Sequence, residues 1–163
     1  MTANVASIRS AVKARIDAVA DKGQTHDYFR WARDDSALLD QIVTTVSGTD
    51  QIRAWMLTVY GPVSNVPAAR EFHRKEYEIE LHGYLGLDDS AATEKTMANL
   101  AEDVVEELEK YPDLNGTLTN GAYADDGQPS IEEFDHRMFA GRFCHHVLIT
   151  ATVYEKGTIT YTV

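Results

Sequence analysis

A change in hydrophobic period between residues 75 and 116 constrains the fold of this chain more than any other feature. From Glu76 to Leu85, apolar side chains alternate with acidic or polar ones, and this period of two predicts a strand with one buried face. Farther on, apolar residues recur at the three- and four-residue steps of one helix face: Met97, Leu100, Ala101, Val104, Val105, Leu108 and Tyr111. The strand and the helix each need an apolar partner, which the rest of the chain must supply.

Other segments offer such partners. Residues 5–19 carry apolar side chains at helical spacing, and Gly23 follows them as a helix-end signal. A second helix is predicted from Asp35 or Ser36 through Val46, and residues 61–72, which contain two prolines and show no period, are predicted to form a loop. Further strands are predicted at 52–60, 131–139 and 143–154, with a short one within 116–123, a turn at 140–142, and a tight turn at 156–157 before a last strand at 158–163.

These elements predict a single α+β domain over residues 1–163. We expect a mostly antiparallel sheet of four to five strands, with two main helices packed on one face. The strands at 74–85 and 143–154 are expected near its centre, because the second is apolar on both sides. The length is that of one ordinary domain, and a 44% apolar content is enough to bury a core.

The formal net charge of −11 excludes nucleic-acid binding through a basic footprint. The sequence contains no run of about 18 apolar residues, so no membrane span is predicted. Cys144 is the only cysteine, which rules out an intrachain disulfide.

Three histidines are the main candidates for chemistry. His145 and His146 are neighbours in a predicted strand, so they are expected to point to opposite faces and not to share a metal ion. His82 shares a strand face with Glu80 and Glu78, but two ligands are fewer than a zinc site uses. The sequence contains no G-x-S-x-G, P-loop or G-x-G-x-x-G motif. We therefore predict no catalytic, cofactor-binding or metal-binding residues.

The remaining reactive groups also have structural interpretations. Cys144 lacks a Cys-x-x-Cys partner and is predicted to be a buried structural thiol. The carboxylates crowded on the long helix are predicted to form its solvated face: Glu102, Asp103, Glu106, Glu107 and Glu109. The basic residues of the first helix are expected either to face solvent or to meet this acidic helix, in the same chain or in a neighbour.

The order of these elements resembles the tail terminator (minor tail, tail-completion) proteins of long-tailed phages and prophages. The resemblance covers about residues 4 to 155. It lies in the segments SIRSAVKARIDAVADKG, IRAWMLTVYG, EYEIELHGYLGL, MANLAEDVVEELEKYPDLNG and HHVLITATVYEK. Two departures are the length of residues 25–49 and the extra piece at 158–163.

The resemblance implies a non-enzymatic structural protein without cofactors. Members of this family assemble as a ring, commonly a hexamer, on the growing tail tube, where the ring ends polymerisation and forms the head-tail joining surface. The implied partners are other copies of the chain, the tail tube protein and a head-neck connector protein, and genome DNA passes the lumen without specific binding. The implied location is the tail-neck junction of the virion, after synthesis in the bacterial host cytoplasm. A strongly acidic chain fits such a lumen, because it repels DNA.

Two other hypotheses stay open at the level of the sequence. One is a small ferredoxin-like ligand-binding or regulatory domain, because fold does not settle function. The other is a metal-dependent enzyme that uses His82, His145 or His146 with a carboxylate. A pocket with convergent polar groups would favour the former, and bound metal the latter.

Overall fold

The computed structural model describes residues 3–30, 34–65 and 72–158. The helices are α1 (Val5–Ala18), α2 (Asp35–Ile42) and α3 (Thr93–Glu109), the last preceded by a short 3-10 turn, η1 (Asp89–Ala91). The strands are β1 (Gln24–His26), β2 (Val43–Val46), β3 (Thr49–Asn65), β4 (Phe72–Gly86), β5 (Ala122–Tyr123), β6 (Ser130–Phe139) and β7 (Arg142–Thr158).

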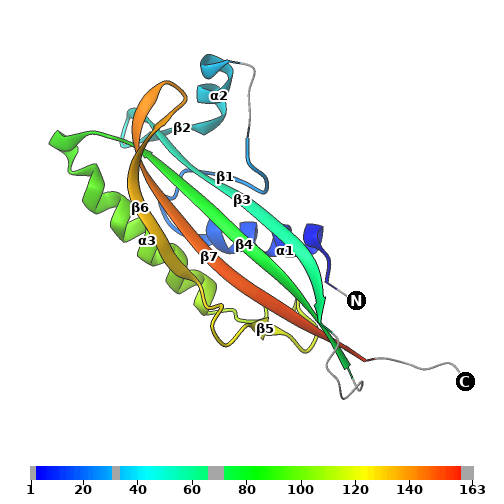
Figure 1. Ribbon diagram of the computed structural model, residues 1–163. Coiled ribbons are helices and arrows are strands. Elements are labelled where there is room, and N and C mark those ends of the chain that lie inside the picture. The colour runs from blue at the N-terminus through cyan, green and yellow to red at the C-terminus, as the bar shows by residue number, and fades with distance from the viewer. Residues whose placement is uncertain (1–2, 31–33, 66–71, 159–163) are drawn as a thin grey trace, which may run out of the picture.

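All of these strands form one seven-stranded mixed sheet (Figure 1). The main strand order is β1-β3-β4-β7-β5. In addition, β2 pairs with β3, and β6 pairs with β7. The β1–β3 pair is parallel, and every other pair is antiparallel. The long strands β3, β4 and β7 run side by side through the middle of the molecule.

The predicted sheet of four to five strands with two main helices is therefore wrong. The described residues contain three α-helices and seven strands. The physical reason is that β3 and β7 are 17 residues long, so successive parts of one strand edge pair with two different partners. The strands β1 and β2 have only three and four residues, which is too short to show a hydrophobic period.

Helices α1 and α3 pack on the same face of the sheet and enclose the larger core. Asn4 begins α1 with a capping box, in which its side chain accepts from the Ser7 amide and the Ser7 hydroxyl accepts from the Asn4 amide. The core residues of both helices are fully or almost fully buried: Ile8, Val12, Ile16, Met97, Val104 and Leu108. They pack against odd-numbered side chains of the three long strands: Trp55, Leu57, Leu81, Val147 and Ile149.

Helix α2 packs on the opposite face, at one end of the sheet (Figure 1). Its buried residues Leu38 and Ile42 contact a second, smaller cluster made by even-numbered sheet residues: Ile52, Ala54, Met56, Tyr84 and Cys144. Helices thus cover both faces of the sheet near the end of β4, and only one face farther along.

Several predicted boundaries differ from the structure. The second helix ends at Ile42, and β2 follows directly, because Val43–Val46 is rich in the β-branched residues that favour strands. Much of the predicted loop at 61–72 belongs to β3 and β4, while residues 66–71 lie outside the described part. The predicted turn at 156–157 lies within β7, which also contains Thr158. The rest of the predicted last strand lies outside the described residues.

None of the helices in the described ranges is long and apolar enough to cross a membrane.

Candidate functional site

The face of the sheet opposite α1 and α3 carries a continuous polar surface beyond α2, here called the polar sheet face. It consists of Thr58 and Tyr60 of β3, Glu76, Glu78, Glu80 and His82 of β4, and Thr150 and Thr152 of β7. Strand register aligns these residues in rows, such as Tyr60, Glu78 and Thr152. Their neighbours in sequence, including Tyr77 and Ile79, point into the larger core, because side chains alternate along a strand.

A group of titratable side chains adjoins the polar sheet face and shares His82 with it. We call this group the histidine cluster: His82, His146, Asp135, Glu133 and Arg137. His82 Nδ1 lies 3.1 Å from His146 Nε2, and the two rings stack with centroids 5.4 Å apart. His146 Nδ1 lies 2.8 Å from Asp135 Oδ1. The imidazole of His146 is 0% exposed, whereas the Asp135 side chain is 44% exposed. The cluster therefore connects a buried imidazole to solvent through one carboxylate.

Burial lowers the pKa of both His82 and His146, and nearby positive charge lowers each of these pKa values further. Partial burial acts to raise the pKa of Asp135, but hydrogen bonds from Arg137 and His146 outweigh it, and the pKa falls below its usual value. The carboxylate of Asp135 accepts a hydrogen bond from His146 Nδ1–H, so His146 Nε2 accepts one from His82 Nδ1–H. The imidazole nitrogens and the carboxylate oxygens together can hold a proton or a cation.

His145 lies on the other face, as the strand geometry predicted. Its Nε2 is 2.9 Å from Thr93 Oγ1 at the start of α3, and its ring centroid is 4.9 Å from that of His136. Cys144 is buried, which confirms the prediction, and burial raises its thiol pKa to about 11. A thiol with such a pKa is almost entirely protonated at neutral pH and is a poor nucleophile.

The acidic face of α3 is solvent-exposed at Glu102, Asp103, Glu106 and Glu109. Glu107 instead lies 3.8 Å from Arg15 of α1, whose guanidinium also stacks on Tyr111 with a 4.3 Å separation. The basic first helix therefore meets the acidic helix within the same chain.

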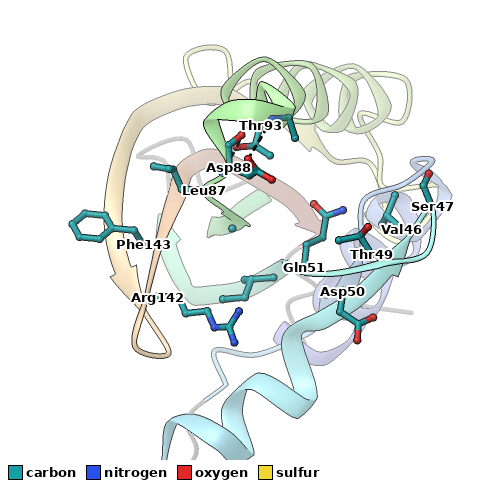
Figure 2. A pocket seen from close by; sticks show the side chains of 13 residues that line it. Val46, Ser47, Thr49, Asp50, Gln51, Leu87, Asp88, Thr93, Arg142 and Phe143 are labelled. Carbon is teal, nitrogen blue, oxygen red and sulfur yellow. Dashed lines mark hydrogen bonds between the residues drawn. The ribbon is translucent and has the colours of Figure 1, made fainter.

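An open cleft of about 700 Å³ lies at the end of the sheet where α3 begins. Figure 2 shows Leu87 and Phe143 on one side of it and the hairpin carrying Val46, Ser47 and Thr49 on the other. The lining mixes apolar side chains with Asp50, Asp88 and Arg142, so a ligand there would meet both charge signs and an apolar wall.

No protein-family model matches the chain, and the curated proteins that were searched contain no match either.

The β6 members of the histidine cluster were not among the residues that the sequence pointed to: Glu133, Asp135 and Arg137. A signal for them exists in the hairpin turn. Phe139 pairs with Arg142, so the turn has two residues, Ala140 and Gly141, and the predicted turn at 140–142 was one residue too long. Both turn residues have positive φ, 49° and 71°, as a type I′ turn requires. Pairing outward from this turn places Asp135 directly opposite His146.

Proposed function

We propose that the chain is a non-enzymatic structural protein of the phage tail terminator kind, which closes into a ring on the tail tube and forms the joining surface for the head. The order of helix, paired long strands, helix and final long strand supports the resemblance. The observation that carries the proposal is the polar sheet face. It is rich in Glu, and it lies opposite the face that α1 and α3 cover.

In this proposal the polar sheet face lines the lumen of the ring. Glu76, Glu78 and Glu80 place three carboxylates along β4. Glu76 forms an ion pair with Arg74 at 2.6 Å, and the Tyr60 hydroxyl donates to Glu80 at 3.2 Å. Such a surface repels the phosphate backbone, so DNA can slide past without a binding step. The helices α1 and α3 then lie on the outer side, because they cover the opposite face.

A ring requires a head-to-tail interface, in which two different surfaces of the same chain meet. The two outer edges of the sheet suit this requirement. Within the described residues, β6 pairs only with β7, and residues 57–65 of β3 pair only with β4. Open strand edges can bind another chain through backbone hydrogen bonds, so the β6 edge of one subunit is the proposed partner of the β3 edge of the next.

The solution mass of the full chain tests this proposal. Light scattering over a concentration series, with negative-stain images of the same sample, should show a closed ring of about six subunits. A chain that stays monomeric at every concentration, and forms no ring when tail tube protein is added, would contradict it.

A charge-reversal pair tests which face lines the lumen. Glu78→Lys with Glu80→Lys replaces two negative charges on the polar sheet face by two positive ones, a change of four charge units, and Glu102→Lys with Glu106→Lys makes the same change on α3. We expect rings of the first variant to retain double-stranded DNA at low salt, with retention lost as salt rises. Rings of the second should not retain DNA within the lumen. Equal behaviour of the two variants would remove the assignment of the lumen face.

The cleft supports a second candidate function, a small ligand-binding or regulatory domain. Its volume of about 700 Å³ lies within the range of small-molecule sites. A metabolite that binds there would raise the melting temperature in a thermal-shift screen, and Arg142→Gln would abolish that shift. A screen without any shift would leave the cleft without a ligand and favour the structural proposal.

A further inference from the structure

We propose that Glu133, Asp135 and His146 form a binding site for a divalent transition-metal ion, with Zn²⁺ as the first ion to test. One donor atom from each of these residues lies within 4.8 Å of the other two. Imidazole nitrogen and carboxylate oxygen are both zinc ligands, and three protein ligands leave one position for water. The inference does not depend on ring formation, and the ion would act as a clip between β6 and β7.

The register between β6 and β7 determines the positions of the three ligand residues. Asp135 lies directly opposite His146 in the β6–β7 hairpin, and Glu133 lies two residues farther along the same face of β6. The atoms His146 Nδ1 and Asp135 Oδ1 are 2.8 Å apart. Neighbouring ligand atoms of a tetrahedral zinc site, with bonds of about 2.0–2.1 Å, are roughly 3.3 Å apart. A small rotation of the half-exposed Asp135 side chain is enough to admit the ion.

His82 is a positioning residue for this site. It lies 3.1 Å from His146 Nε2, on the side of the imidazole ring away from the carboxylates. When His146 Nδ1 binds the ion, its Nε2–H donates to His82 Nδ1, and the Nε2–H of His82 then faces the Glu80 carboxylate at 3.9 Å. Metal-ligating histidines generally have such a partner on the second nitrogen, which fixes the tautomer and the ring orientation.

Arg137 is the competitor of the proposed ion. Its Nε donates to Asp135 Oδ2 at 3.0 Å, and its Nη2 donates to Glu133, so the guanidinium balances both carboxylates and keeps them close together. The side chain of Arg137 is 41% exposed, and those of Asp135 and Glu133 are 44% and 47% exposed. The guanidinium can therefore rotate outward, toward solvent, as an ion enters from the same side.

Isothermal titration of the metal-free full chain with Zn²⁺ tests the site. We expect one Zn²⁺ per chain, no comparable heat with Mg²⁺, and at least a tenfold loss of Zn²⁺ affinity in Asp135→Asn and in Glu133→Gln. The matched control is Glu132→Gln, because that carboxylate accepts from Ser130 and Thr150 and lies outside the ligand set. Arg137→Gln should bind Zn²⁺ more tightly, because it removes the competing cation.

The variant His82→Gln tests whether His82 positions the His146 ligand or only fills space beside it. It should weaken Zn²⁺ binding about 10- to 100-fold while leaving the chain folded by circular dichroism. Absence of Zn²⁺ binding in both the natural chain and Arg137→Gln would overturn the proposal. So would binding that is unchanged in Asp135→Asn and Glu133→Gln, since the ion would then occupy other histidines. These two carboxylates are exposed, so their variants keep the test valid even if His146→Gln fails to fold.

Discussion

Gly83 is the position where one added methyl group should disturb the core most clearly. It lies on β4 directly opposite Trp55 of β3. A Cβ atom at this position would lie 2.6 Å from Trp55 Cζ3, 2.8 Å from Trp55 Cη2 and 2.7 Å from Met97 Cε. Carbon atoms in good contact are about 3.5–4.0 Å apart, so the neighbours of Gly83 must move by roughly 1 Å.

The two neighbours differ in how easily they can move. The terminal methyl of Met97 can change rotamer, as methionine usually can. The indole of Trp55 is 1% exposed, and its Nε1–H donates to the Lys22 carbonyl oxygen at 3.1 Å, so it is held in place. Overpacking of this kind costs about 1–3 kcal/mol, and we expect Gly83→Ala to lower the free energy of unfolding by that amount.

Urea denaturation measures this effect, and Gly86→Ala is the matched control on the same strand. A Cβ at Gly86 has its nearest neighbour at 3.6 Å, which is ordinary contact, so its effect should stay within about 0.5 kcal/mol. In a Trp55→Phe background the smaller ring leaves room for the methyl group, and the cost of Gly83→Ala should shrink by at least about 0.5 kcal/mol. Equal stability of the two alanine variants, or no coupling to Trp55, would refute this packing argument.

Three further predictions concern pH, capping and the thiol. Burial lowers the pKa of four histidines: His26, His82, His145 and His146. Below about pH 6.5 the unfolded chain therefore binds more protons than the folded one. The free energy of unfolding should fall as pH is lowered from 7 to 5, by up to about 1.4 kcal/mol per pH unit for each histidine. Urea midpoints that do not change over this range would contradict the burial of neutral imidazoles. Asn4→Ala removes the side-chain cap of α1 and should lower the free energy of unfolding by about 1 kcal/mol in the same assay. An unchanged free energy of unfolding would show that the cap is not formed. Cys144, with a thiol pKa of about 11, should react with Ellman's reagent only after unfolding, and fast labelling of the folded chain would show that it is accessible.

The elements with the clearest hydrophobic period were the ones that sequence reasoning located best. The strand predicted at 74–85 corresponds to β4, and the long helix predicted after it corresponds to α3. The short strands β1 and β2 were missed as sheet members, because three or four residues carry no period and their pairing depends on long-range contacts. The short strand β5 lies within the one predicted at 116–123. The β-branched run Val43–Val46 was a local signal against helix that the helical pattern before it obscured.

The histidine cluster illustrates what the sequence could and could not supply. Alternation along β7 correctly separated His145 from His146. The approach of His82 to His146 depends on the register between β4 and β7, in which Tyr84 pairs with His146, and nothing in either strand alone specifies that register. The position of Asp135 was accessible from the two-residue turn at Ala140–Gly141, since turn length determines hairpin register.

The most direct test of the proposed structural role is the capping of tail tubes. The tail tube protein of the phage or prophage to which the proposal assigns this chain would be polymerised with and without it, and tube lengths and tube ends would be measured by electron microscopy. We expect tubes of limited length, each closed at one end by a ring of this protein. Tubes that grow to the same lengths in its presence, with bare ends, would contradict it.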